Sequence, residues 1–272
     1  MRRRSWWIVY PLLGLAAVLT LAPFALAILG ASTSPAAFAA RGPFALPDPW
    51  TLENYAEVSG GRADLAGAVA RTALVALFLT ATQLLTSVMA AYAFAKLRFP
   101  GRRALFAGFL ATLLVPPILT VIPLYLMMTA AGLRGTFWGI VLPFALASPF
   151  AIFLLREHFR SLPDALLDAA RMDGLGPIAV LWRIVLPLSR PALAAIALVT
   201  VVSQWNSFLW PRLIAGQAYP LVTVSVASLQ TQHRSNWTLV LAGGTIALVP
   251  LLAAAWLAHS RFSRALAIGA GR

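Results

Sequence analysis

Six long apolar intervals, separated by short segments that carry most of the charged residues, dominate the pattern of this chain. A membrane-spanning helix needs about 20 mostly apolar residues, and each interval approaches or exceeds that length. The pattern predicts membrane spans over residues 6–28, 72–95, 104–130, 136–155, 191–211 and 238–258. The predicted fold class is therefore an all-α integral membrane protein with six transmembrane helices, in which residues 1–272 form a single transmembrane domain.

Several of these intervals contain proline. In a helix bundle, neighbouring helices or water can satisfy the carbonyl groups that a proline frees, so prolines do not argue against the spans. They do predict kinks in the helices. The prolines concerned are Pro116, Pro117, Pro123, Pro143 and Pro250.

Composition agrees with a bilayer environment. Hydrophobic residues make up 60% of the 272 residues and charged residues only 11%, which is more apolar surface than one soluble core requires. The first interval follows "MRRR" and contains "ALA", as a signal peptide would. We expect an uncleaved anchor, because residues 6–28 exceed the roughly 7–15 apolar residues of a cleavable signal. Cysteine is absent, which excludes disulfides and thiolate chemistry.

The net charge of +13 is distributed unevenly around the spans. If the N-terminus is cytoplasmic, 15 of the 21 Lys and Arg residues lie on the inner side and 6 on the outer side. The inner residues are Arg2, Arg3, Arg4, Lys96, Arg98, Arg102, Arg103, Arg156, Arg160, Arg171, Arg183, Arg190, Arg261, Arg264 and Arg272. The outer residues are Arg41, Arg62, Arg71, Arg134, Arg212 and Arg234. This bias predicts that both termini and residues 161–190 are cytoplasmic, and it removes the main argument for nucleic-acid binding.

Motifs for catalysis are missing from the sequence. It contains no phosphate-binding Gly-x-x-x-x-Gly-Lys-Ser/Thr loop, no His-Glu-x-x-His and no Gly-x-Ser-x-Gly. His158, His233 and His259 fall near span ends on two different sides, so they cannot share a metal. No Asp, Glu or Lys lies in the middle of a span, as ion-coupled transport usually requires. We expect a protein that is not an enzyme and holds no cofactor, and whose energy for any uphill transport comes from a partner.

Outside the spans, two segments have distinct patterns. The outer segment 29–65 predicts a short, partly helical cap. The inner segment 161–188 has the signals of a short helix over about residues 162–173. Ser161 and Asp164 have the Ser-x-x-acid spacing of a helix start, Gly174 is a plausible left-handed stop, and Pro177 can begin a second helix.

The predicted helix at 162–173 has two different faces. Asp164, Asp168 and Arg171 share one face. The other is an apolar stripe of small and medium side chains: Leu162, Ala165, Leu166, Ala169 and Met172. Such a helix could lie on the inner leaflet, but leaflet-binding helices usually have a basic polar face, and this one leads with two aspartates. The pattern favours insertion into a groove of a basic cytoplasmic protein.

At these residues the chain resembles a known family. Asp168-Ala169-Ala170, Asp173-Gly174, and then Ile184, Leu186 and Pro187 resemble the signature cytoplasmic loop of ABC importer permeases, with Asp168 where the family usually has Glu. Five further stretches resemble the second permease subunit of maltose-type carbohydrate importers. They are "TLENY" (51–55), "AYAFAKLRFPGR" (91–102), "GLRGTFWGIVLP" (132–143), "REHFRSLPDALLDAARMDG" (156–174) and "SQWNSFLWP" (203–211).

The resemblance implies a multi-pass protein of a prokaryotic cell membrane that forms a heteromeric importer of a sugar or sugar-like solute. It implies a homologous second permease, two ATP-binding subunits that bind ATP and Mg, and an extracytoplasmic solute-binding protein as partners. The loop 161–188 would then hold a coupling helix that docks on the ATPase. The coupling residues it implies are Asp164, Asp168, Ala169, Ala170, Arg171, Asp173, Gly174, Leu186 and Pro187.

The candidates for solute contact are four residues predicted to lie in the fifth span, namely Gln204, Trp205, Asn206 and Ser207. Sugars are commonly held by amide hydrogen bonds and aromatic stacking. The favoured alternative is that Gln204 and Asn206 hydrogen-bond neighbouring helices, as polar residues in bundles often do. Gln83, alone in the second span, is predicted to have such a packing role.

Two other functions fit parts of the sequence. A membrane scaffold could bind an ATPase without transporting a solute. A secondary transporter would take up its solute without ATP and would depend on an ion gradient.

Overall fold

A computed structural model describes residues 6–44, 46–60, 64–232 and 236–269 of the chain. Of the residues named above, seven lie outside the described residues: Arg2, Arg3, Arg4, Arg62, His233, Arg234 and Arg272. Within the described part every regular element is helical, and the only β-pairing is an isolated bridge between Thr33 and Trp50. The all-helical fold predicted from the sequence is confirmed.

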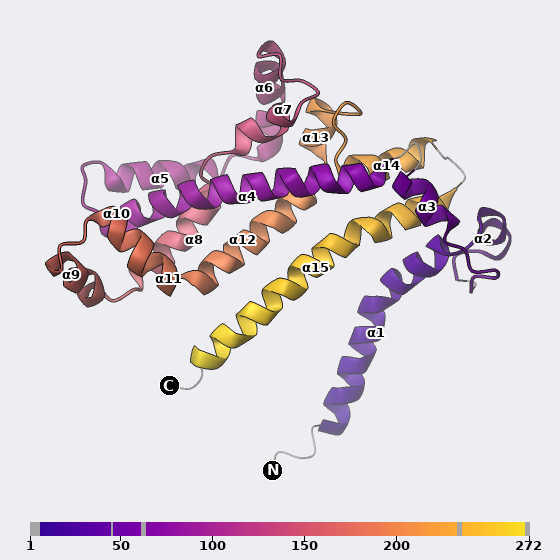
Figure 1. Ribbon diagram of the computed structural model, residues 1–272, viewed down its shortest axis with the longest axis horizontal. Coiled ribbons are helices and arrows are strands. Elements are labelled where there is room, and N and C mark those ends of the chain that lie inside the picture. The colour runs from indigo at the N-terminus through magenta and orange to yellow at the C-terminus, as the bar shows by residue number, and fades with distance from the viewer. Residues whose placement is uncertain (1–5, 45, 61–63, 233–235, 270–272) are drawn as a thin grey trace. The chain divides into compact units, whose positions relative to one another are not determined.

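The chain divides into two compact units. The first comprises Met1–Val69 and Val222–Pro250, and the second comprises Ala70–Leu221 and Leu251–Arg272. The α-helices are labelled in Figure 1, and two short elements are a 3-10 helix (η1) and a π-helix (η2). In chain order the elements are α1 (Trp6–Ala31), α2 (Pro35–Arg41), α3 (Glu53–Gly60), α4 (Leu65–Lys96), α5 (Arg102–Thr112), α6 (Pro117–Ala130), α7 (Phe137–Val141), η1 (Leu142–Phe144), α8 (Pro149–Arg160), α9 (Asp164–Met172), α10 (Pro177–Val180), η2 (Leu181–Val185), α11 (Leu186–Leu188), α12 (Arg190–Trp205), α13 (Leu209–Ile214), α14 (Val222–Gln232) and α15 (Trp237–Gly269).

Three continuous helices are long and apolar enough to cross a membrane. They contain the segments Val9–Ala31, Leu65–Lys96 and Trp237–Trp256, which match the first, second and sixth predicted spans. Three bent helix pairs also pass when each pair is taken as one span, so the described chain has three to six candidate spans. Pro123 and Pro250 lie inside the continuous helices α6 and α15.

The predicted kinks at Pro116 and Pro117 are confirmed as a break between helices, whereas Pro143 lies inside η1, before the break that precedes α8. The axes of α5 and α6 differ by 93°, because Pro116 and Pro117 interrupt the backbone ladder and Pro117 begins the new helix. Phe137–Phe144 and α8 are bent by 43°, with Pro143 inside η1 and Pro149 at the start of α8.

The fifth predicted span, 191–211, is not one continuous helix. α12 ends at Trp205 and α13 starts at Leu209, because Pro211 in a continuous helix would clash with the carbonyl of Ser207. The segment Pro177–Leu188 precedes α12 at an angle of 82°, with the break beside Pro191, and the two together satisfy the length and composition of a broken span.

In the first unit, a buried asparagine joins three segments. The side-chain amide of Asn54 on α3 donates to the carbonyls of Ala31 (2.8 Å) and Thr33 (2.9 Å). Its Oδ1 accepts from the Thr238 hydroxyl at the start of α15 (3.0 Å). The predicted cap over 29–65 is confirmed as partly helical, since it contains α2 and α3.

In the second unit, α8 contacts both α5 and α12 (Figure 1). A buried cluster, here called the α9 core, joins α4, α8, α9, α10, the π-helix η2 and α12. Its members are Val88, Ala91, Tyr92, Ala151, Leu155, Phe159, Leu167, Ala170, Val180, Leu181, Val185 and Ile196.

Candidate functional site

The helix predicted over 162–173 is α9, Asp164–Met172. It ends in two backbone hydrogen bonds, from the Gly174 N–H to the Arg171 carbonyl and from the Leu175 N–H to the Ala170 carbonyl, both 3.0 Å. This pair of bonds is a Schellman motif, which requires a left-handed residue after the helix. Gly174 has a φ of 81°, and Pro177 begins α10, so both predicted signals are confirmed.

The prediction that Ser161 begins this helix is wrong. Ser161 ends α8, where its hydroxyl donates to the His158 carbonyl at 2.7 Å. α9 follows Pro163 and has no side-chain cap. The reason is Pro163, which disfavours helical geometry at Leu162 and therefore moves the helix start to Asp164.

α9 packs on the α9 core through one narrow face. Leu167 and Ala170 are 2% and 4% exposed and lie among residues of α4, α8 and η2. Of the predicted apolar stripe, Leu162 is half-buried against this core, while Ala165, Leu166, Ala169 and Met172 are exposed. The helix is thus held from inside by two residues and presents most of its apolar stripe to the outside.

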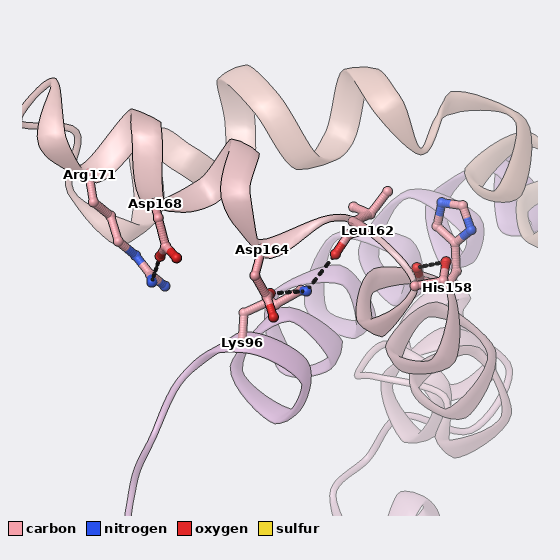
Figure 2. A network of polar contacts seen from close by, with 7 residues as sticks. Lys96, His158, Leu162, Asp164, Asp168 and Arg171 are labelled. Carbon is pink, nitrogen blue, oxygen red and sulfur yellow. Dashed lines mark hydrogen bonds and ion pairs between the residues drawn. The ribbon is translucent and has the colours of Figure 1, made fainter.

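Lys96, the last residue of α4, links the second predicted span to the connection between α8 and α9 through two hydrogen bonds. Its ammonium group donates to the Leu162 carbonyl at 2.9 Å and to Asp164 Oδ1 at 2.7 Å (Figure 2). The Lys96 side chain is 6% exposed, whereas that of Asp164 is 80% exposed. The hydrogen bond from Lys96, and then its positive charge, hold the pKa of Asp164 below the ordinary value.

Sequence reasoning missed this role of Lys96, because a lysine at the end of a span is usually a topology signal. The available signal was the combination of a span-terminal lysine with an acid in the first turn of the next cytoplasmic helix. That combination does not predict which basic residue pairs with Asp164, because the inner side has many other basic residues.

Two members of the predicted polar face meet. Asp168 Oδ1 accepts from Arg171 Nη1 at 2.9 Å, and both side chains are about half or more exposed (Figure 2). Asp164 does not join this pair because it turns to Lys96. Asp168 therefore has free surface for a partner, and an exposed i,i+3 pair contributes only about 0.3–0.5 kcal/mol to the helix.

The other predicted coupling residues surround α9. Asp173 is the exposed residue that closes the helix, and Ala169 lies on its exposed side. After α10 and η2, Leu186 is half-buried against the α9 core, and Pro187 is exposed in α11. The structure thus gathers the loop 161–188 around one core, with Ala170 and Leu186 inward and the acidic residues outward.

The four candidate solute residues have different environments. Trp205 is 5% exposed, and Ser207 is half-buried in the break after α12. The Asn206 side chain donates to the Val202 carbonyl of its own helix at 2.8 Å. The expected bond from Asn206 to a neighbouring helix is therefore replaced by a cap of α12.

Of these four residues, only Gln204 lines a cavity of about 540 Å³. Gln83, Phe144, Ser148 and Thr200 also line this cavity. Gln83 Nε2 donates to the Phe144 carbonyl at 2.6 Å, so its predicted packing role is confirmed. In the described part of the chain, no three His, Cys, Asp or Glu residues are placed to hold a metal ion.

These features define a multi-pass helical membrane protein with a short, two-sided helix between its candidate spans. The chain belongs to the family described as binding-protein-dependent transport system inner membrane component, whose family model matches residues 83–267. It is accordingly a membrane-embedded transport permease component and not a catalytic enzyme.

Three relatives illustrate the family. The chain is 34% identical over 180 residues to the arabinooligosaccharides transport system permease protein AraQ of Halalkalibacterium halodurans, covering 65% of this chain and 64% of AraQ. It is 36% identical over 170 residues to the diacetylchitobiose uptake system permease protein NgcG of Streptomyces coelicolor, covering 62% and 56%. It is 32% identical over 231 residues to the sn-glycerol-3-phosphate transport system permease protein UgpE of Yersinia enterocolitica, covering 81% of both chains.

A solved structure is also similar. It is the crystal structure of a bacterial ABC transporter involved in the import of the acidic polysaccharide alginate. The TM-score is 0.81 at 28% identity, and the match covers 96% of this chain and 99% of that one.

Proposed function

We propose that this chain is a six-span permease subunit of an ATP-driven importer for a sugar or sugar-like solute. Its family membership and the sugar-transport names of AraQ and NgcG support this proposal. The complex would contain a homologous second permease, two ATP-binding subunits that hold ATP and Mg, and an extracytoplasmic solute-binding protein. The loop 161–188 would lie in the cytoplasm, as the charge bias indicates.

The observation that carries the coupling role is the two-sided packing of α9. Its inner face, with Leu167 and Ala170, belongs to the α9 core, and its outer face presents Leu166 and Met172 to the surroundings. An amphipathic helix with exposed apolar residues at this spacing suits a groove in a partner protein. Asp168, beside this face, would meet a basic residue of the ATPase.

Movement of α9 can be transmitted to the candidate spans because the α9 core contains buried residues of α9 and of the helices α4, α8 and α12. Leu167 packs in the same cluster as Val88 of α4 and Ile196 of α12. Close-packed interiors transmit displacement because they have little room to deform. Lys96 adds a polar tie from the α8–α9 connection to α4. An ATPase that pulls on α9 would therefore shift α4, α8 and α12 together.

The decisive residue for this proposal is Asp168. Removing one charge of a buried interface pair typically costs about 2–5 kcal/mol. Asp168→Lys should therefore abolish ATP-driven uptake and weaken co-purification of the ATPase, while Asp168→Glu should be tolerated. The measurement is solute-stimulated ATPase activity of the reconstituted complex, together with uptake.

A charge-swapped control separates this role from the pair inside the helix. Asp168→Arg combined with Arg171→Asp restores an i,i+3 pair but presents the wrong charge to the partner. We expect the swapped protein to remain inactive. Wild-type uptake in Asp168→Lys would contradict the anchor role, and recovery in the swapped protein would show that only the internal pair matters.

For the solute pathway, the cavity favours Gln204, whose side chain lies at its wall. Trp205, Asn206 and Ser207 would then shape the end of α12 next to it. Gln204→Ala should lower uptake of the solute while the complex still assembles. Asn206→Ala is the matched control, because Asn206 bonds to its own helix. Loss of assembly and uptake together in Gln204→Ala would assign Gln204 to packing instead.

A further inference from the structure

A basic pocket lies where the end of α4, the start of α5 and the last turns of α8 meet. It has a volume of about 240 Å³, and four arginines line it together with aromatic residues: Arg102, Arg103, Arg156, Arg160, Phe94 and Phe106. A second hollow beside it shares Arg102 and Arg103 and adds Arg98. Because Arg160 ends α8 just before α9, both hollows lie at the same end of the unit as the coupling loop.

The arginines of the two hollows differ in their contacts. Arg102 and Arg156 help to build the wall of the first hollow. Arg102 Nη1 donates to the Leu97 carbonyl at 2.8 Å, and the Arg156 guanidinium stacks 4.0 Å from the centre of the Phe106 ring. The side chains of Arg98 and Arg103 have no hydrogen bond or ion pair with any residue that the structure describes.

The local charge is not balanced. Glu157 is the only acidic residue paired with these arginines in the described part of the chain, and it contacts both Arg156 and Arg160. Five guanidinium groups line the two hollows, and Glu157 pairs with two of them. Like charges held this close repel each other, so the arrangement favours binding of a further anion.

Guanidinium clusters recognise phosphate, since their planar N–H groups match its oxygens in pairs. The flanking surface indicates the source of that phosphate. Directly after the arginines, α5 presents apolar residues to the outside, with Leu105 55% exposed and Ala104 and Ala107 also exposed. A charged head beside an apolar helix face matches a phospholipid, whose acyl chains would lie along α5.

We infer that this pocket, with Arg103 and Arg160 as its main charged groups, binds the phosphate headgroup of an anionic phospholipid in the leaflet on the α9 side. Basic pockets between transmembrane helices bind such headgroups, and each basic residue near the surface contributes about a fivefold gain in affinity. The lipid would bridge α5 and α8 at the end of the unit that carries the coupling loop.

The test is equilibrium binding of short-chain phosphatidylglycerol to the purified, assembled transporter complex in detergent. Short-chain phosphatidylcholine, which carries the same chains without net charge, and inorganic phosphate are the two comparison probes. We expect phosphatidylglycerol to bind and the other two probes to bind at least about tenfold more weakly, since neither combines net charge with chains. Inorganic phosphate binding as tightly as phosphatidylglycerol would overturn the lipid assignment.

Two variants locate the site. Arg103→Gln with Arg160→Gln should weaken phosphatidylglycerol binding about 25-fold, as expected for two lost charges. Arg103→Lys with Arg160→Lys keeps the charge and should stay within about fivefold of the original affinity. Arg134→Gln, at an exposed position in the α6–α7 connection, is the matched single-charge control and should bind normally. Unchanged affinity in the double Gln variant, or an equal loss in Arg134→Gln, would overturn the proposed site.

Discussion

Replacing Leu167 with alanine should release α9 from the α9 core. Leu167 is 2% exposed, and the substitution removes three buried carbon atoms. At about 0.8 kcal/mol for each, the loss of transfer free energy alone is about 2.4 kcal/mol. The cavity left behind raises the total cost toward about 3–5 kcal/mol. Even the smaller value shifts the docking equilibrium of α9 about 50-fold.

Leu166→Ala is the matched control, because it removes the same atoms from the next residue on the same helix. Leu166 is 49% exposed and lies on the outer face of α9. Its removal should change the stability of the isolated chain by less than about 0.5 kcal/mol. If the outer face docks on the ATPase, Leu166→Ala should still weaken ATPase association.

The assay combines hydrogen exchange of the α9 backbone amides with solute-stimulated ATPase activity and uptake. Leu167→Ala should exchange faster in α9 and lose most coupled uptake, while Leu166→Ala should keep its α9 protection when the chain is measured without the ATPase. Unchanged α9 protection and uptake in Leu167→Ala would refute the reasoning that the α9 core holds and transmits the position of this helix.

Three further predictions follow from the same region. Gly174→Val should destabilise the end of α9 by about 1–3 kcal/mol and reduce coupled uptake, because the backbone φ of Gly174 is 81°. Gly174→Asn should have a smaller effect, because asparagine adopts the left-handed conformation more readily than valine. Equal effects of the two substitutions would contradict the conformational explanation. Because Lys96 lowers the pKa of Asp164, their contact contributes fully above the ordinary Asp value of 3.8 and is lost as the pH falls through the lower folded-state pKa. The protection factors of the amides at the start of α9, which correct for the slower intrinsic exchange at low pH, should therefore fall on acidification, and Lys96→Met should remove that dependence; an identical acid response in the variant would exclude the contact as its cause. In intact cells, a membrane-impermeant thiol reagent should label Arg134→Cys and not Ser161→Cys, and the reverse pattern would invert the topology.

The sequence was sufficient for features that depend on local chemistry. Gly174 predicted the end of α9 and Pro177 the start of α10, because glycine is strongly enriched just after a helix and proline at the first helical position. The continuous spans followed from length and hydropathy. The error at Ser161 also has a local cause, since Pro163 excluded helical geometry one residue before it.

The pattern of hydrophobic and polar residues does not predict features that depend on tertiary packing. The sequence of α9 contains an apolar stripe through Leu166 and Met172, and also the pair Leu167 and Ala170, and nothing local decides which set is buried. The structure buries the second set because α4, α8 and η2 form the core beneath it. The partner of Lys96 was undetermined for the same reason, because the contact joins residues 68 positions apart.

The most direct test of the central claim is a cross-link between α9 and the ATPase. The chain contains no cysteine, so a single introduced thiol reports from one position. Met172 is 88% exposed on the outer face of α9. In the assembled complex, Met172→Cys should form a short thiol-directed cross-link to the ATP-binding subunit, whereas Arg134→Cys should form none. An assembled, active complex in which Met172→Cys gives no more cross-link than Arg134→Cys would contradict the assignment of α9 as the coupling helix.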